Sequence, residues 1–214
     1  MHAFFVRFNR LLNAPLDLGP RLCLVLAAVL LVAVFVLPLW NMTMFAPQYP
    51  EGLRLDIFSY ALVGGNGGQD LKEINLLNHY IGMRDLAIED FTEFKWLPFA
   101  VGIIGLLYLR ASVIGTLGTL VDVVVLNTYF SLFSLWSFGY KLWAYGHTLA
   151  PTASVKVAPF MPPMFGYKQL ANFEVYSYPA AASYAMALST LLVTAALVIT
   201  WRRARRDASA PAAA

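Results

Sequence analysis

Three long runs of apolar residues constrain this chain more than any other feature of its sequence. The first run covers residues 22–40 and the third covers 180–201, and neither contains a charged side chain. The second run, 97–138, holds only Arg110 and Asp122 among its 42 residues. A transmembrane helix needs about 20 apolar residues. The first and third runs therefore each match one membrane span, and the second is long enough for two.

The composition agrees with a membrane protein and excludes several other classes. Charged residues make up 13% of the chain and apolar residues 59%, whereas a soluble domain carries about 25% charged residues. A chain with so little polar surface cannot be a soluble enzyme or a disordered protein. Cys23 is the single cysteine, so an internal disulfide and a CxxC metal or redox pair are also excluded.

Charge distribution decides between three and four spans. Residues 41–96 hold eight acidic side chains against four basic ones. Four spans place Arg110 and both arginine-rich ends on the cytoplasmic side, as the positive-inside rule requires, whereas three spans would leave the last cluster outside. The net charge of +3 therefore reports orientation and does not indicate nucleic-acid binding. The arginines at the two ends are Arg7, Arg10, Arg21, Arg202, Arg203, Arg205 and Arg206.

We therefore predict an all-α integral membrane protein with four transmembrane helices and both termini inside. The two long outer loops, 41–94 and 139–179, are predicted to form one small mixed α+β extracytoplasmic domain. Residues 1–21 form a cytoplasmic N-terminus that is either a short interfacial helix or simply an apolar end, and no signal-peptide cleavage site follows it. Residues 202–214 form a basic tail with a disordered end of small residues. The predicted spans are 22–40, 95–110, 112–138 and 180–201, with Trp40, Trp96, Trp136 and Trp143 as an aromatic belt.

The first outer loop contains a predicted strand, a turn and a helix. Residues 53–60 alternate apolar and polar side chains, as a half-buried strand does. The glycine-rich segment 64–68 is interpreted as a flexible turn, because it lacks the Gly-Lys-Ser/Thr ending of a phosphate loop. Asp70 and Glu73 then resemble a capping box at the start of a helix, and Gly82 is predicted to end that helix.

Histidine and methionine side chains gather in the outer loops and suggest a copper site. His79 and Met83 are four residues apart, so on a helix they would lie one above the other. Five of the six methionines after the initiator fall in the outer loops, and thioether and imidazole ligands select Cu(I). The alternative is that the methionines fill gaps in a small core. The candidate Cu(I) ligands are His79, Met83, His147, Met161 and Met164.

Asp122 is predicted to lie about ten residues into the third span, roughly 15 Å deep. An intramembrane carboxylate is costly and suggests a function. A proton relay would need further such groups, and the spans offer none. We favour a packing role beside Gly115 and Gly118, where small residues let another helix approach. Asp122 would then bond to a partner subunit or to the last span, at Ser189, Thr190 or Thr194.

The outer loops resemble a bacterial inner-membrane accessory family that is associated with nitrous-oxide reductase gene clusters. The resemblance covers about half of the chain and hardly includes the spans. It implies an inner-membrane location, a denitrifying or microaerobic respiring bacterium and a copper context, and it assigns no catalytic residue. The similar strings are Tyr49-Pro50-Glu51-Gly52-Leu53, the segment from Asp70 to Met83, Ala158-Pro159-Phe160-Met161-Pro162-Pro163, and Ala171-Asn172-Phe173.

The predicted function is that of a non-enzymatic, multi-pass protein of the bacterial inner membrane with its outer loops in the periplasm. It would assist a periplasmic copper-dependent respiratory enzyme, either by handling Cu(I) or by maturing or tethering the enzyme. The alternative is a structural subunit of a membrane electron-transfer complex whose outer loops dock a partner. A haem or quinol site with His79 and His147 ranks last, because neither residue lies in a predicted span. The expected partners are membrane lipid and a protein, and not nucleic acid.

Overall fold

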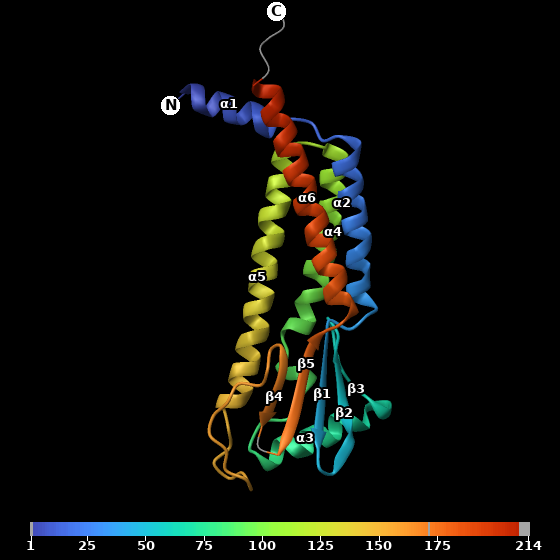
Figure 1. The fold of residues 1–214 in the computed structure, drawn as a ribbon, viewed down its shortest axis with the longest axis vertical. Coiled ribbons are helices and arrows are strands. Elements are labelled where there is room, and N and C mark those ends of the chain that lie inside the picture. Colours follow the sequence, from blue (N-terminus) through green and yellow to red (C-terminus); the bar gives the residue numbers. More distant parts are fainter. Residues whose placement is uncertain (1, 171, 210–214) are drawn as a thin grey trace, which may run out of the picture. The chain divides into compact units, whose positions relative to one another are not determined.

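The computed structural model describes residues 2–170 and 172–209 and divides into two compact units (Figure 1). The helical unit comprises 1–32, 100–131 and 185–214, and the sheet unit comprises 33–99 and 132–184. Three of the α-helices continue from one unit into the other. The predicted disordered tail lies partly outside the described residues, because the last helix continues through Ser209 and the chain beyond it is not described.

Helices form most of the chain. They are α1 (His2–Leu12), α2 (Leu18–Leu31), η1 (Val32–Phe35), η2 (Asn66–Gly68), α3 (Gln69–Tyr80), η3 (Ile88–Asp90), α4 (Glu93–Ile114), α5 (Leu117–His147) and α6 (Ala181–Ser209). Among the described residues, four helical segments are long and apolar enough to cross a membrane: Leu18–Phe35, Glu93–Ile114, Leu117–His147 and Ala181–Asp207. The prediction that the second apolar run contains two helices is confirmed.

The helix ends differ from the predicted span limits for local reasons. The break in the second run falls at Gly115, which adopts φ +66°, a conformation that glycine accepts readily. Arg110 stays inside α4, because arginine is a good helix former. The first helical segment stops at Phe35, and Trp40 begins a strand. The prediction that the helix of the first span continues to Trp40 is therefore wrong.

Polar side chains join helices inside the helical unit. The Tyr108 hydroxyl of α4 donates to Asn127 Oδ1 of α5 at 2.7 Å, and Asn127 Nδ2 donates to Thr190 Oγ1 of α6 at 3.2 Å. Ser189 Oγ of α6 donates to the Ala27 carbonyl of α2 at 2.9 Å. Polar side chains therefore bond helices together inside the unit, as they do between helices that pack in a membrane, beside buried apolar residues such as Leu24, Leu120 and Val193.

The outer surface of the helical unit is apolar. No more than 33% of the residues in any of the four apolar windows are buried. A helix of a soluble protein buries its apolar stripe and exposes polar residues, whereas these helices expose large apolar side chains as well as burying others. Large side chains that are more than half exposed include Val29, Leu106, Val113 and Leu191.

Arg21 fixes the connection between α1 and α2 to the turn between α4 and α5. Its Nε donates to the Leu16 carbonyl at 3.0 Å, and its Nη1 donates to the carbonyls of Ser112 at 3.1 Å and Val113 at 3.2 Å. A Cβ at Gly115 would lie 2.1 Å from Nη2 of Arg21. The glycine is therefore required by its positive φ and by the close approach of the guanidinium.

The sheet unit contains one antiparallel sheet built from both predicted outer loops (Figure 1). The strand order is β3-β2-β1-β5-β4, so the chain's first and second loop segments meet where β1 pairs with β5. In this register Met42 of β1 lies opposite Leu55 of β2 and Ser177 of β5. The strands are β1 (Trp40–Ala46), β2 (Tyr49–Ile57), β3 (Leu62–Gly64), β4 (Gly166–Leu170) and β5 (Phe173–Pro179).

The sheet packs its apolar face against α3 and around Trp40. The Trp40 indole N–H donates to Ser177 Oγ at 2.8 Å, and its ring lies 5.0 Å from the ring of Phe138 and 4.9 Å from that of Phe165. The predicted strand at 53–60 and the predicted helix after the glycine run are both confirmed. The buried cluster contains Trp40, Met42, Ala46, Leu53, Leu55, Leu62, Ile74, Leu77 and Val175.

The start of α3 is held by a buried carboxylate and not by the predicted capping box. The N-cap is Gly68, with φ +92° and no side-chain cap. Asp70 is 3% exposed, and its carboxylate accepts from the Arg54 backbone N–H at 2.9 Å and from Asn66 Nδ2 at 2.8 Å. A Cβ at Gly65 would lie 2.4 Å from Asp70 Oδ2. The glycine run therefore allows β2 and α3 to approach closely, beyond supplying a flexible turn.

Candidate functional site

The second face of the sheet is open. In Figure 1 the strands lie in front of α3, and no described element of the sheet unit crosses their near side. The side chains of β1 and β2 alternate between the buried cluster and this face, because successive residues of a strand point to opposite sides. The open face is therefore a surface of the sheet unit that could receive a ligand or partner.

Four aromatic side chains gather on this open face, and we call them the tyrosine face: Phe45, Tyr167, Tyr176 and Tyr178. The Tyr176 ring lies 5.6 Å from that of Phe45, edge to face at 87°, and 5.0 Å from that of Tyr167. Tyr167 is 50% exposed and Tyr178 is 49% exposed. The rings therefore pack on one another while leaving much of their surface free.

Polar side chains border the tyrosine face on β1 and β2. In the sheet register, Asn41 lies opposite Tyr178 and Thr43 lies opposite Tyr176. Asn41 Nδ2 donates to Asp56 Oδ1 at 2.8 Å, and Arg54 Nε donates to Asp56 Oδ2 at 3.0 Å. The charges of Arg54 and Asp56 beside the rings are thus paired with each other.

The side chains of the tyrosine face are suited to binding through ring contacts and hydrogen bonds. Partial burial, followed by the neighbouring Glu174 carboxylate, raises the pKa of Tyr176 above its ordinary value. The phenol therefore stays protonated at neutral pH and serves as a hydrogen-bond donor and acceptor. Tyrosine presents a large rigid surface with a polar end, and it is enriched in protein–protein interfaces.

The sequence contains a signal for this face that the initial interpretation missed. Residues 173–178 alternate between side chains of the buried side and Glu174, Tyr176 and Tyr178, which is the pattern of a half-buried strand. What the sequence could not show is the pairing with β1 and β4. That pairing places Phe45 and Tyr167 beside Tyr176.

The predicted pairing of His79 and Met83 on one helix is wrong. The helix α3 ends at Tyr80, and a Schellman motif follows: the N–H of Gly82 donates to the His79 carbonyl at 3.1 Å, and the N–H of Met83 donates to the Asn78 carbonyl at 2.9 Å. Gly82 has φ +79°, which confirms the predicted helix stop. Met83 lies beyond that stop, so helical spacing does not stack it on His79.

His147 is the best oriented of the predicted copper ligands. It is the last residue of α5, and its ring stacks on that of Trp143 at 4.4 Å and 18°. Its Nδ1 lies 2.8 Å from the Trp143 carbonyl. Because a carbonyl can only accept, Nδ1 carries the proton and Nε2 keeps its lone pair for a ligand. Histidine ligands of metals are commonly oriented in this way by a backbone carbonyl.

Backbone hydrogen bonds bring the segments that carry the candidate ligands close together. Val155 N–H donates to the Tyr80 carbonyl at 2.9 Å, and Phe160 N–H donates to the Gly146 carbonyl at 3.0 Å. These bonds connect the end of α3, the end of α5 and the loop that carries Met161. Met161 and Met164 use their backbone carbonyls to accept from Lys168 and Ser177.

The candidate ligand side chains come from three segments: around the end of α3, the end of α5 and the loop before β4. In the part of the chain that the structure describes, no hydrogen bond or ring contact joins two of them, and no group of three or more His, Cys, Asp or Glu side chains is placed to hold a metal ion. Met42 and Met44 belong to the sheet core or pack against it. Those two methionines therefore fit the gap-filling alternative.

Five polar residues hold the segment before α4 against α5. Glu93 accepts from Ser137 Oγ at 2.7 Å and pairs with Lys141 at 3.6 Å. Lys141 Nζ also donates to the Asp90 carbonyl at 2.5 Å, and the Tyr145 hydroxyl donates to Asp90 Oδ2 at 3.3 Å. Each of these charged groups has a partner, so the cluster is a structural clamp.

Among the described residues, Asp122 does not make the predicted bond to Ser189, Thr190 or Thr194 of the last span. The helix α5 begins at Leu117, so Asp122 lies about 7.5 Å along it, half the predicted depth. Its side chain is exposed and lines a small hollow with Arg110. Asn127, one and a half turns further on, makes the bond to Thr190 instead. The polar contact between the third and fourth spans therefore exists, but a neutral amide provides it.

Comparisons with known proteins identify no relative of this chain. No protein-family model, curated protein or solved structure matches this chain. The assignment of function therefore depends on the geometry of the two units, and in particular on the open sheet face and on the orientation of His147.

Proposed function

We propose that this chain is a non-enzymatic, four-span protein of the bacterial inner membrane that docks a periplasmic copper-dependent respiratory enzyme. Membrane insertion is supported by the apolar outer surface and polar interior contacts of the helical unit. Large apolar side chains on the outside of a helix bundle need an apolar solvent, and a bilayer supplies it.

The charges of the two units support an orientation with both termini in the cytoplasm. The residues of the helical unit include eight basic and three acidic side chains, whereas those of the sheet unit include seven basic and nine acidic ones. Positive charge accumulates on the cytoplasmic side of membrane proteins. The sheet unit, with its tyrosine face, therefore belongs in the periplasm.

The observation that carries the docking function is the tyrosine face. Its rings lie on a rigid sheet, so little side-chain entropy is lost when a partner covers them, and tyrosine is the kind of residue that dominates interface energetics. The neighbouring ion pair of Arg54 and Asp56 provides a polar rim. We propose that a folded protein domain occupies this face, because the mixture of rings, hydroxyls and paired charges suits a protein surface better than lipid.

Site-specific photocrosslinking in native membranes tests this proposal. A photoreactive phenylalanine analogue replaces Tyr178, which is 49% exposed on the open face, or Tyr80, which is 47% exposed on α3. We expect the analogue at position 178 to capture a copper-dependent respiratory enzyme or a membrane subunit of it, and the matched analogue at position 80 to capture neither. Equal capture at both positions, or none at position 178 in respiring cells, would contradict docking through this face.

Copper handling is the second candidate, and the orientation of His147 favours it. The exposed Nε2 can bind Cu(I), and the loop that carries Met161 is bonded to the residue before His147. We expect His147→Ala to weaken Cu(I) binding in a chelator competition, and His79→Ala with Met83→Ala to weaken it further. Met186→Leu in α6 is the control for loss of a thioether. If metal analysis of gently purified protein finds no copper, copper handling is excluded and docking remains as the proposed function.

A further inference from the structure

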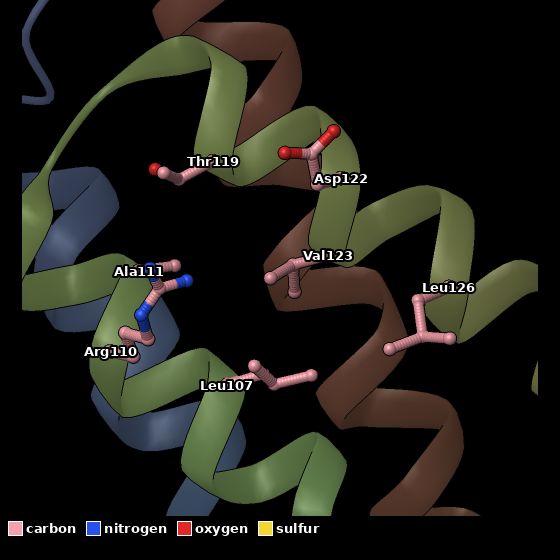
Figure 2. Close-up of a pocket in the computed structure, with 7 residues that line it drawn as sticks. All are labelled: Leu107, Arg110, Ala111, Thr119, Asp122, Val123 and Leu126. Atoms are coloured by element: carbon pink, nitrogen blue, oxygen red, sulfur yellow. The ribbon is translucent and has the colours of Figure 1, made fainter.

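A small hollow opens between α4 and α5 within the helical unit. Its volume is about 100 Å³, roughly three times the ~30 Å³ that one water occupies in the liquid. Figure 2 shows the hollow with side chains from both helices on its two walls. The lining residues are Leu107, Arg110, Ala111, Thr119, Asp122, Val123 and Leu126.

Two opposite charges flank this hollow at the same level. Arg110 precedes the last residue of α4 by four positions, and Asp122 follows the first residue of α5 by five. Because the helices are joined by a two-residue turn and run antiparallel, both charges lie about 6–8 Å from the turn. Figure 2 shows Arg110 on one wall and Asp122 on the other.

Neither charge is neutralised by the protein. Among residues 2–170 and 172–209, no ion pair involves Arg110 or Asp122, and no hydrogen bond to either side chain is present. Two other charges near this end do have partners: Arg21 binds three carbonyls, and Arg203 pairs with Asp17. The hollow therefore presents one free cation and one free anion.

The walls of the hollow are polar near the α4–α5 turn and become apolar further along the two helices. Thr119 lies one turn nearer the α4–α5 turn than Asp122 or Val123, whereas Leu107 and Leu126 lie one turn further away. The Thr119 hydroxyl donates to the Thr116 carbonyl at 2.8 Å, so its oxygen remains able to accept. Polar groups near the helix ends and apolar groups deeper along them match the head and chains of a phospholipid in one leaflet.

We propose that this hollow binds the headgroup of a phosphatidylethanolamine. Arg110 donates to the phosphate, Asp122 accepts from the primary ammonium, and Thr119 offers a further acceptor. The acyl chains continue over Leu107 and Leu126 on the lipid-facing surface. This inference rests on the proposed membrane insertion of α4 and α5, which places the hollow in the cytoplasmic leaflet.

The pair of charges selects this headgroup over the other common ones. A phosphatidylglycerol headgroup offers no cation to Asp122, whose carboxylate repels the lipid's negative charge. A phosphatidylcholine headgroup carries a positive charge, but its methyl groups remove every N–H donor that a carboxylate could accept from. Of these three headgroups, only the ethanolamine head combines a phosphate for Arg110 with a cationic N–H donor for Asp122.

Native mass spectrometry of the delipidated full-length chain in mild detergent tests the proposal. The probes are palmitoyl-oleoyl phosphatidylethanolamine, its N-monomethyl and N,N-dimethyl derivatives, phosphatidylcholine and phosphatidylglycerol. We expect retention of one lipid per chain to fall stepwise as methyl groups replace N–H donors, with at least a fivefold difference between the ends of the series. Equal retention across the series, or preference for phosphatidylglycerol, would overturn the proposal.

Conservative substitutions of the lining residues test whether the lipid binds in the hollow. We expect Asp122→Asn to abolish the preference for ethanolamine over choline, and Arg110→Gln to reduce retention of both. Arg205→Gln and Asp207→Asn on α6 make the same charge changes away from the hollow, and we expect them to leave retention unchanged. An effect of these controls equal to that of the hollow variants would overturn the proposal. A cysteine-accessibility test of membrane topology on the same proteins separates failure of lipid binding from failure of insertion.

Discussion

The two units of this protein are built with opposite distributions of polar and apolar side chains. In the helical unit, Leu106 is 68% exposed, while Asn127 is buried and bonded to two other helices. In the sheet unit, Leu55 is 2% exposed, while the pair of Arg54 and Asp56 lies on the surface. One chain thus contains both an apolar exterior and a water-facing exterior.

This difference is what we expect if, as proposed, the helical unit lies in a bilayer and the sheet unit in water. In water, burial of apolar surface drives folding by about 25 cal/mol per Å², and the core of the sheet unit follows that rule. In a bilayer the surroundings are as apolar as leucine, so association depends on close packing and on hydrogen bonds between helices. The same substitution should therefore have different effects in the two units.

The largest expected difference is between two leucine substitutions. Leu55→Ala removes a buried side chain from the sheet core, so we expect the free energy of unfolding of the sheet unit to fall by about 2–5 kcal/mol. Leu106→Ala removes a side chain that faces outward, and we expect a change within about 0.5 kcal/mol. Denaturant unfolding in mild detergent measures both. A large loss of unfolding free energy for Leu106→Ala would show that Leu106 packs against other protein. It would contradict the difference between the two units.

The next effect concerns the connection between α1 and α2. Arg21→Ala removes three hydrogen bonds from a charged donor to carbonyls, and we expect a loss of roughly 1.5–3 kcal/mol. Hydrogen exchange should show faster exchange at residues 13–17 and at the end of α4. Arg10→Ala, on the exposed surface of α1, is the matched control, and unchanged exchange in Arg21→Ala would contradict the role of the guanidinium.

A smaller effect is expected for the polar contact inside the helical unit. Asn127→Ala removes bonds to Tyr108 and Thr190, and hydrogen bonds between helices in membranes contribute about 0.6–1.7 kcal/mol. A double-mutant cycle with Tyr108→Phe measures the coupling between the two side chains. Thr128→Ala removes only a bond within α5 and is the control. An absence of coupling would contradict the contact.

The smallest effect is a pH dependence in the sheet unit. The Tyr49 hydroxyl donates to Glu73, and this bond, together with one from Gln69, lowers the pKa of Glu73 below its ordinary value of 4.5. A lowered pKa in the folded state stabilises the protein above pH 4.5, and that contribution is lost as the pH falls through the folded-state pKa. The same bond raises the pKa of Tyr49, so the contribution is also lost in strong alkali.

A comparison of Tyr49→Phe with the unchanged protein measures this bond. We expect the unchanged protein to have the higher melting temperature at pH 7, and the difference to shrink as the pH is lowered below about 4. Tyr60→Phe, at an exposed position outside this pair, is the control. A difference that stays constant down to pH 3 would show that lost packing, and not the hydrogen bond, causes the change.

The fold was predictable to the extent that local patterns decide it. The apolar runs led to four long helices, the alternation at 53–60 led to a strand, and Gly82 marked the end of α3. The errors have specific causes. Trp40 was assigned to a span because apolar length cannot distinguish a helix end from a buried strand. Met83 was assigned to the face of a helix that Gly82 had already ended.

The candidate site was less predictable, because it depends on pairing between distant segments. The sequence around Tyr176 does not predict which side chains lie beside it in space. Only the register of β5 with β1 and β4 brings Phe45 and Tyr167 next to it. Asp122 was notable in the sequence for its charge, but only the packing of α4 against α5 shows that Arg110 lines the same hollow. Sequence patterns report periodicity along one element and cannot report which elements meet.

The sequence by itself determined that this chain divides into apolar helices and a more polar pair of connecting segments, because hydropathy and charge act residue by residue. The tertiary structure alone decided that the two connecting segments form a single sheet with an open aromatic face. It also decided that Asn127 rather than Asp122 joins the helices, because a buried hydrogen bond needs a partner at bonding distance. Only the packing of α4, α5 and α6 brings Asn127 to Tyr108 and Thr190, and it leaves Asp122 facing outward.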